Sequence, residues 1–168
     1  MKCTLRHWRE QDAADLALAL NNQKILDNLR DGLPFPYTER DAAQFIAAMH
    51  SADPDKVFAY AIDVDGHAVG SISATRQGNI HFRTAEVGYY VAEPFWGQGI
   101  ATNAVTQICD LLFSQTDILR IFAQPFAHNL ASCRVLEKAS FSCEGLLRKN
   151  AVKHGVILDM KLYARLRY

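Results

Sequence analysis

The sequence predicts a mixed α/β fold, of the α+β kind, with a mostly antiparallel sheet flanked by helices. Strand and helix patterns follow the order β, α, α, β, β, β, α, β, α, β, β. The three consecutive strand patterns indicate an antiparallel meander, whose first turn carries the strong two-residue hairpin signal Asp65-Gly66. The 168 residues can bury a sizeable core, and no linker or repeat interrupts them, so we expect a single domain over residues 1–168.

The first half of the chain predicts a strand, two helices and the meander. We expect a strand at residues 3–8 and a helix that opens at Asp12 with leucines at helical spacing. A proline-containing loop at residues 26–37 precedes a second helix, which starts at Thr38 with Asp41 in a capping-box-like position. The meander strands are expected at residues 57–64, 69–74 and 83–91.

The second half predicts two helices and three further strands. A helix from Ile100 has an apolar face expected to pack on the sheet and a polar face expected to meet water. A strand at residues 119–124 leads to a helix at 129–139 that is capped by Asn129. Strand structure resumes at Phe141, and period-two alternation predicts a closing strand over residues 156–166.

Composition narrows the class of protein. Lys plus Arg and Asp plus Glu number 18 each, so no overall charge attracts nucleic acid or a membrane surface. No span is long and apolar enough to cross a bilayer, and the first residues lack the apolar core of a signal peptide. We therefore expect a cytoplasmic protein without nucleic-acid or membrane partners. Four cysteines show no CxxC spacing and are expected to be buried in strands and helices, without a metal: Cys3, Cys109, Cys133 and Cys143.

The segment from Tyr89 to Cys109, YYVAEPFWGQGIATNAVTQIC, carries the clearest functional signal. It predicts a strand that feeds a glycine turn at the start of a helix. The first N–H groups of a helix have no acceptor within it, and the helix dipole adds partial positive charge there, so this arrangement binds phosphate groups. Gly97 and Gly99 allow a ligand to approach the main chain closely. Neither a P-loop nor a dinucleotide fingerprint fits, because no Gly-Lys-Ser/Thr follows and Thr102 stands where a third glycine belongs.

Two segments resemble the GNAT superfamily of acyl-CoA-dependent N-acetyltransferases, most closely its RimJ and RimL type of ribosomal-protein N-terminal acetyltransferases. They are EVGYYVAEPFWGQGIATNAV, which looks like that family's strand, pyrophosphate loop and helix, and NLASCRVLEKASF, which looks like its following helix. The likeness covers nearly the full length. Trp96 occupies a position where the superfamily usually has Gln or Arg and where this type commonly accepts an aromatic residue.

The resemblance implies acetyl-CoA as co-substrate and a set of residues that bind it. The main chain of Gly97 to Ala101 would hold the pyrophosphate, and Tyr90 and Val91 would pair their main chain with pantetheine. Asn129 and Ser132 match family residues near pantetheine and the thiol. The full set of cofactor-binding residues that the resemblance implies is Tyr90, Val91, Trp96, Gly97, Gln98, Gly99, Ile100, Ala101, Thr102, Asn129 and Ser132.

The resemblance also implies direct transfer of an acetyl group to a primary amine in a ternary complex. The Val91 N–H would hold the oxyanion, and Glu86 is the first candidate base, through water, with His81 second. Many members have a general-acid Tyr where this chain has Leu136, so the acid role passes to Ser132, to water or to no group. A thiol with a pKa of about 8.5 can leave as the thiolate with little protonation by a general acid. An α-amine with a pKa of about 7.7 to 8.0 is more easily deprotonated by a base than a lysine side chain is.

Several alternatives stay open at the level of sequence. Glu86 can equally pair with Arg83 or Arg76, and Asn129 can serve as a helix cap as well as a ligand contact. Asp159 is either solvent-exposed or part of the acceptor cleft. Three aromatic residues either wall the acceptor pocket or belong to the core: Phe35, Tyr37 and Tyr163.

The identity of the acceptor also stays open: it is either a protein or peptide N-terminus or a small-molecule amine. The protein is expected to be a monomer or homodimer. The alternative function is a non-catalytic sensor or partner module that binds acyl-CoA. This alternative stays open because Leu136 stands where many members have the general-acid tyrosine.

Overall fold

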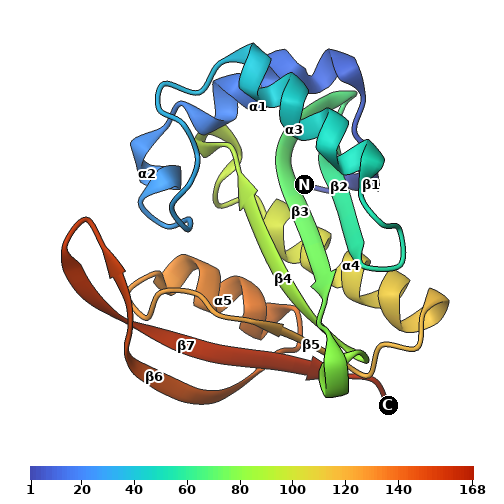
Figure 1. Cartoon of the computed structure of the whole chain (residues 1–168), viewed down its shortest axis with the longest axis vertical. Coiled ribbons are helices and arrows are strands. Elements are labelled where there is room, and N and C mark those ends of the chain that lie inside the picture. The colour runs from blue at the N-terminus through green and yellow to red at the C-terminus, as the bar shows by residue number, and fades with distance from the viewer.

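In the computed structural model, which describes residues 1–168, one seven-stranded sheet runs in the order β1-β2-β3-β4-β5-β7-β6 (Figure 1). Neighbouring strands are antiparallel except for β4 and β5, which are parallel. The mixed, mostly antiparallel sheet predicted from the sequence is therefore confirmed. The strands are β1 (Thr4–Arg6), β2 (Val57–Val64), β3 (His67–Arg76), β4 (Thr84–Val91), β5 (Arg120–Ala123), β6 (Ser142–Lys153) and β7 (Val156–Leu166).

Helices cover the sheet on both sides (Figure 1). None of them combines the length and the apolar composition that crossing a bilayer requires. α2, which was not predicted from the sequence, is a single turn that starts where the Asn22 side chain accepts a hydrogen bond from the Lys24 N–H at 2.9 Å. The helices are α1 (Ala13–Leu20), α2 (Gln23–Leu26), α3 (Glu39–Ser51), α4 (Ile100–Gln115) and α5 (Leu130–Lys138).

Two separate hydrophobic cores lie on the two faces of the sheet. The larger packs α4 and α5 against the strands, with Ile72 of β3 and Ile108 of α4 among its fully buried side chains. The smaller packs α1 and α3 against Ala61 and Ala68, with Leu16 and Ile46 buried. Because side chains alternate between the faces of a strand, β3 and β4 contribute to both cores. Each face of β4 therefore has its own chemical surroundings.

Local sequence signals set several boundaries. The Thr38 hydroxyl and the Asp41 carboxylate form the predicted capping box at the start of α3. Asp65 and Gly66 both adopt positive φ, 53° and 90°, which is the backbone of the predicted tight hairpin. Asn129 caps α5, where its Oδ1 accepts a hydrogen bond from the Ser132 N–H at 3.2 Å.

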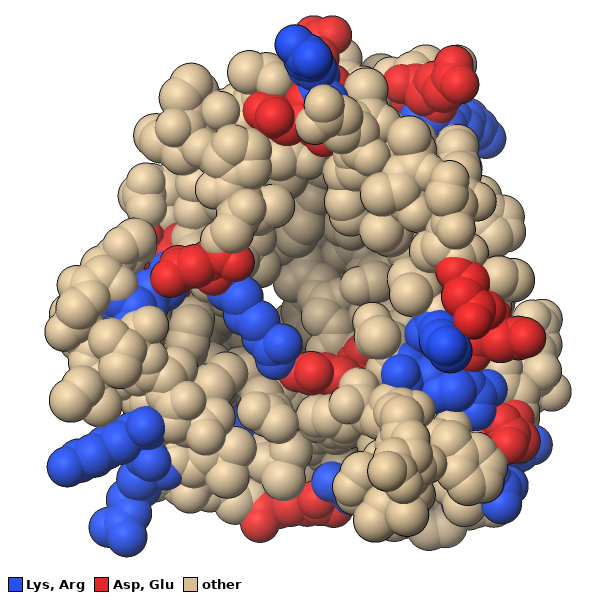
Figure 2. Space-filling model, viewed as in Figure 1, with Lys and Arg blue, Asp and Glu red and all other residues tan.

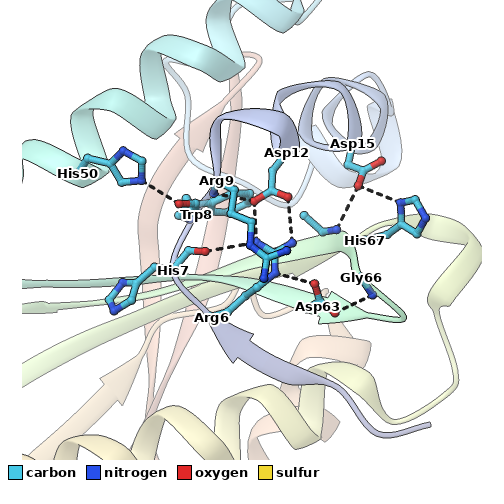
Figure 3. A network of polar contacts seen from close by, with 11 residues as sticks. Arg6, His7, Trp8, Arg9, Asp12, Asp15, His50, Asp63, Gly66 and His67 are labelled. Atoms are coloured by element: carbon cyan, nitrogen blue, oxygen red, sulfur yellow. Dashed lines mark hydrogen bonds and ion pairs between the residues drawn. The ribbon is translucent and has the colours of Figure 1, made fainter.

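A buried ion network fixes the N-terminal strand to the rest of the sheet (Figure 3). The Arg6 guanidinium donates to both oxygens of Asp12, at 2.7 and 2.9 Å, and to Asp63 at 2.6 Å. Burial raises the pKa of Asp12, but hydrogen bonds from Arg6 and from the Arg9 N–H outweigh it and leave that pKa below its usual value. Asp63 also accepts from the Gly66 N–H at 2.9 Å, so the network joins β1, the turn that leads into α1 and the β2–β3 turn.

Two predictions about buried and exposed faces are wrong in part. Cys143 is exposed on β6, the edge strand of the sheet, whereas the other three cysteines are buried as predicted. The polar face of α4 was expected to face only solvent, but two of its side chains form hydrogen bonds with Cys3. Asn103 accepts from the Cys3 N–H at 3.1 Å, and Gln107 donates to the Cys3 carbonyl at 2.9 Å, because β1 lies beside this helix.

Candidate active site

The parallel pairing of β4 and β5 ends after three residue pairs, of which Glu86 with Phe122 is the last. Beyond Glu86 the two strands diverge, as Figure 1 shows. The segment of β4 from Val87 to Val91 therefore has an edge with no partner strand. Main-chain groups at such an edge can pair with an extended ligand.

A cavity of about 850 Å³ occupies this divergence. Figure 2 shows the same face hollowed at its centre, with basic and acidic side chains meeting at the rim of the hollow. One part of the lining comes from α1, α2, α3 and the loop before α3, and the other from the glycine loop and α5. The volume is suited to a small-molecule site, and the cavity continues from one group of elements to the other.

The glycine loop lies at the start of α4 with its main chain free. Gly97 and Gly99 have φ of 74° and 77°, a conformation that residues with a Cβ rarely adopt. The main-chain N–H groups of the six residues from Gly97 to Thr102 donate to no protein acceptor, and the first helical bond runs from Asn103 to Gly99. Gly97, Gly99, Ile100, Ala101 and Thr102 line the cavity. This cradle of unpaired donors at a helix N-terminus fits a pyrophosphate.

Trp96 fixes the end of β4 next to this loop. Its indole Nε1–H donates to the Val91 carbonyl at 2.6 Å, although 45% of the residue's surface is exposed. Gln98 folds back, so that its side-chain amide donates to the Pro94 carbonyl at 3.1 Å. Trp96 is therefore placed to hold the loop against the strand.

Alternation along β4 decides which main-chain groups face the open edge. The Ala92 N–H bonds to β3, so Tyr90 also directs its main chain toward β3, and Val91 and Tyr89 direct theirs toward the gap. The Val91 N–H is free there, whereas its carbonyl is held by Trp96. This geometry favours Tyr89 and Val91 for main-chain pairing, in place of the Tyr90 and Val91 expected from the sequence. Tyr90 instead contributes its side chain to the cavity lining.

Tyr89 is a candidate functional residue that the sequence analysis missed. Its hydroxyl oxygen lies 2.9 Å from the Ser132 hydroxyl oxygen, and burial raises the pKa of the phenol well above its usual value. Tyr89, Asn129 and Ser132 all line the cavity. Leu136 is fully buried in the larger core and does not line it.

Glu86 lines the opposite part of the cavity and pairs with Arg30, from the loop between α2 and α3. The partners considered from the sequence were wrong, because the Arg76 and Arg83 guanidinium groups both bond Asp117. Arg30 lies 56 positions from Glu86, and its approach depends on how the loop folds over the sheet. His81, the second candidate base, is exposed in a turn and does not line the cavity.

Other residues considered for the acceptor side divide between cleft, surface and core. Tyr37 lines the cavity, Phe35 is 62% exposed outside it, and Tyr163 is buried in the larger core. Asp159 accepts a hydrogen bond from the Lys149 N–H at 2.7 Å, within the β6–β7 hairpin, and does not line the cavity.

The cysteines of α4 and α5 do not line the cavity. Cys109 and Cys133 are both buried in the larger core. Burial raises the pKa of the Cys109 thiol to about 12. Such a thiol is not an activated nucleophile.

The family to which this site belongs follows from comparison with known proteins. The model of the acetyltransferase (GNAT) domain matches residues 2–142, which is most of the chain. The chain belongs to the GNAT acetyltransferase family. The resemblance seen in the sequence is thus confirmed, and the open β4 edge with its glycine loop belongs to a GNAT fold.

Individual GNAT relatives agree with the family match. A probable N-acetyltransferase of Bacillus subtilis (strain 168), YjcK, is 37% identical over 100 residues, which cover 60% of this chain and 55% of YjcK. The ribosomal-protein-serine acetyltransferase of Escherichia coli (strain K12) is 27% identical over 89% of this chain and 83% of its own length. The chain spans about half the length of YjcK and of two further Bacillus N-acetyltransferases.

A solved GNAT structure has the same fold over nearly the whole chain. Mycobacterium smegmatis RimJ, in complex with a CoA-disulfide, superposes with a TM-score of 0.86 at 27% identity. The match covers 96% of this chain and 80% of RimJ.

Proposed function

We propose that this GNAT protein transfers an acetyl group from acetyl-CoA directly to a primary amine, with both substrates bound together. The observation that carries the proposal is the run of six unpaired main-chain N–H groups, Gly97 to Thr102, beside the open edge of β4. A pyrophosphate accepts hydrogen bonds from the N–H groups of the loop, and an extended pantetheine arm pairs with the main chain of Tyr89, which leaves the Val91 N–H for the thioester carbonyl. The RimJ relative, described with a CoA-disulfide, supports the same ligand.

Further residues complete the proposed cofactor site. The amide nitrogen of Asn129 has no protein acceptor, so it is free to donate to a pantetheine carbonyl while Oδ1 caps α5. Arg134 and Lys138 lie one helical turn apart on α5 and line the same cavity without an acidic partner. Their positive charges complement the negatively charged phosphate on the ribose of CoA. Thr102 adds a hydroxyl beside the loop.

The proposed reaction forms a bond from the acceptor nitrogen to the acetyl carbon and breaks the carbon–sulfur bond of the thioester. Glu86 takes the proton of the nitrogen through water, once Arg30 has moved away from it. The Val91 N–H donates to the carbonyl oxygen as negative charge develops there. The Tyr89 and Ser132 hydroxyls form one hydrogen-bonded chain, and the hydroxyl at its end donates to the departing sulfur. No acyl-enzyme is needed, since neither Cys109 nor Cys133 lines the cavity.

An α-amine is the acceptor that this site favours over a lysine or a polyamine. The charged side chains of the lining include four basic residues and a single carboxylate, Glu86, so the cavity does not attract polycations. An α-amine with a pKa of about 7.7 to 8.0 is also already deprotonated in roughly a tenth of molecules at pH 7. The name of the ribosomal-protein-serine acetyltransferase relative supports a protein as the acceptor.

Two measurements on the purified protein test the proposal. Isothermal titration with CoA gives a dissociation constant, and an acetyl-transfer assay follows thiol release with N-terminal peptides, amino acids, polyamines and lysine side-chain analogues. We expect CoA to bind and thiol release to depend on an α-amine. Absence of CoA binding contradicts the proposal. Tight CoA binding with no transfer to any acceptor favours the acyl-CoA-binding module, which the buried Leu136 in the general-acid position makes the second candidate.

A further inference from the structure

The charges inside the cavity are unequally distributed. Among the charged residues of its lining, Lys24 pairs with Glu93 outside, and Arg134 and Lys138 lie on α5. In the part of the cavity lined by α1, α2, α3 and the loop before α3, which we call the acceptor part, this leaves Arg30 and Glu86, which pair with each other, as the charged groups not paired outside the cavity. The electrostatics of the acceptor part depends chiefly on this pair.

The residues of β3 beside Glu86 are uncharged. Thr75 pairs with Glu86 in the β3–β4 ladder, and Ser73 and Ser71 continue along the same face opposite Gly88 and Tyr90. All three hydroxyl residues line the cavity. They can donate and accept hydrogen bonds but bring no charge that competes with Arg30 or Glu86.

The Arg30 side chain is free to exchange its partner. It is 70% exposed, whereas the Glu86 side chain is 24% exposed. Ion pairs with an exposed member contribute little net free energy, because water solvates the released charge well. A protonated amine that enters the cavity can therefore replace the guanidinium beside Glu86.

Lys153 bonds the residues on both sides of Arg30. The Lys153 ammonium, from the turn end of β6, donates to the Leu29 carbonyl at 2.7 Å and to Asp31 at 3.0 Å. The Lys153 side chain is only 8% exposed, so its bond to the Leu29 carbonyl is shielded from water, whereas Asp31 is 70% exposed. When the Arg30 side chain leaves Glu86, its backbone therefore stays at the mouth of the cavity.

We propose that Arg30 selects acceptors that carry a carboxylate close to the primary amine, an inference that rests on the proposed function. The ammonium of the acceptor takes the place of the guanidinium at Glu86, and the released guanidinium binds the carboxylate of the acceptor. One ion pair becomes two. An acceptor with a second cation instead leaves Arg30 facing a like charge, which costs binding free energy. The carboxylate can belong to an acidic residue near a peptide N-terminus or to a free amino acid.

Matched acceptors test this exchange. Three peptides that differ only in a second residue of Glu, Gln or Lys report on an acidic side chain, and serine against serinamide reports on a free carboxylate. For the wild type we expect kcat/KM to fall from the Glu to the Gln to the Lys peptide, with about tenfold between the ends. A preference for serine over serinamide without a preference among the peptides identifies a free amino acid as the source of the carboxylate.

Variants that change the charge at position 30 test whether Arg30 causes the preference among these acceptors. Arg30→Glu reverses the order of the peptides, and Arg30→Gln brings them to within about twofold of one another. Arg40→Glu, an equal charge change at an exposed α3 residue outside the cavity, leaves the wild-type order intact. Thermal unfolding of each variant verifies that it is folded. If Arg30→Glu does not fold, Arg30→Gln still tests the role of Arg30.

The outcomes distinguish a failure of the role of Arg30 from a failure of the proposed function. If the wild type transfers acetyl groups but Arg30→Glu and Arg30→Gln keep its preferences, the role of Arg30 is wrong and the proposed function stands. If the wild type binds no CoA and acetylates none of these acceptors, the proposed function fails and the role of Arg30 fails with it.

Discussion

The hydroxyl oxygens of Tyr89 and Ser132 lie 2.9 Å apart, which links the open end of β4 to the first turn of α5. Burial raises the pKa of the partly buried phenol further above its usual value, so both hydroxyls stay protonated at ordinary pH, and whichever hydroxyl donates within the pair, the other keeps its proton. At the position where many GNAT members have a tyrosine, this chain has the buried Leu136. The hydroxyl pair therefore offers hydrogen bonds to a departing sulfur from a different element.

We predict that Tyr89→Phe and Ser132→Ala each lower kcat by about tenfold, through loss of one hydrogen bond to a charged group. The double variant should lose little more than either single variant, because the two hydroxyls form one chain. Steady-state kinetics of the three variants tests this. Ser114→Ala, at an exposed residue of α4, is the control, and fully additive losses would show that the hydroxyls act separately.

Replacement of Gly99 by Ala should weaken CoA binding. The added Cβ meets no neighbouring atom within 4 Å, so its effect comes from the positive φ of 77°. A residue with a Cβ in that conformation costs about 1–2 kcal/mol, which the loop avoids by moving its N–H groups out of line. We expect about a tenfold rise in the CoA dissociation constant in calorimetry. Gly78→Ala, at φ −101° with equally open space, should change nothing, and an equal loss in both variants would contradict the role of the loop.

Removal of both charges of Arg134 and Lys138 should raise KM for acetyl-CoA by about tenfold. The analogue without the 3′-phosphate should be used equally by wild type and the double alanine variant, because it lacks the group that these side chains bind. Arg148→Ala, at an exposed β6 residue, provides the control. An equal loss with both cofactors would show that the two residues act through the structure of α5.

Lys153→Met should weaken acceptor binding more than cofactor binding. The ammonium of Lys153 holds the Leu29 carbonyl and Asp31, and its removal frees the loop that carries Arg30. We expect KM for the acceptor to rise by about fivefold or more and KM for acetyl-CoA to stay constant. Lys149→Met on the exposed part of β6 is the matched control. A parallel rise in both KM values would indicate general loosening of the fold.

Loss of Asp12 should destabilise the whole protein. Asp12→Ala leaves the buried Arg6 guanidinium with only Asp63 as a carboxylate partner, so we expect a loss of about 3 kcal/mol in the free energy of unfolding. Urea unfolding measures it, with the exposed Glu10→Ala as control. Retention of wild-type stability in Asp12→Ala would contradict the importance of the network.

The same network predicts how stability depends on pH. The folded-state pKa values of Asp12 and Asp63 are lowered, so their contribution is fully present above the unfolded value of about 3.9. It is lost as pH falls below about 4 and through the folded-state values. The acid slope of unfolding free energy should therefore be shallower in Asp12→Ala than in the wild type, and an identical slope would exclude this origin.

Features with local causes could be predicted from the sequence. The Thr38–Asp41 capping box and the Asp65-Gly66 turn depend on residues within four positions of each other, and both form as expected. The glycine loop was recognisable because its conformation requires glycine at two defined positions.

Features that depend on the meeting of distant segments could not be predicted in the same way. The Arg30–Glu86 and Tyr89–Ser132 contacts join residues 56 and 43 positions apart, and no spacing rule connects them. The choice between Tyr89 and Tyr90 required the register of β3 against β4, which fixes the direction of each main-chain group. Exposure of Cys143 depended on β6 being an outer strand.

The early end of the β4–β5 ladder has a consequence for the lifetime of the protein in a cell. A ligand that completes the missing strand binds the native chain and not the unfolded one, so each bound molecule opposes denaturation. With free cofactor at a hundred times its dissociation constant, native molecules gain about 2.7 kcal/mol. Metabolic supply of the acyl donor would then govern resistance to proteolysis as well as catalytic output.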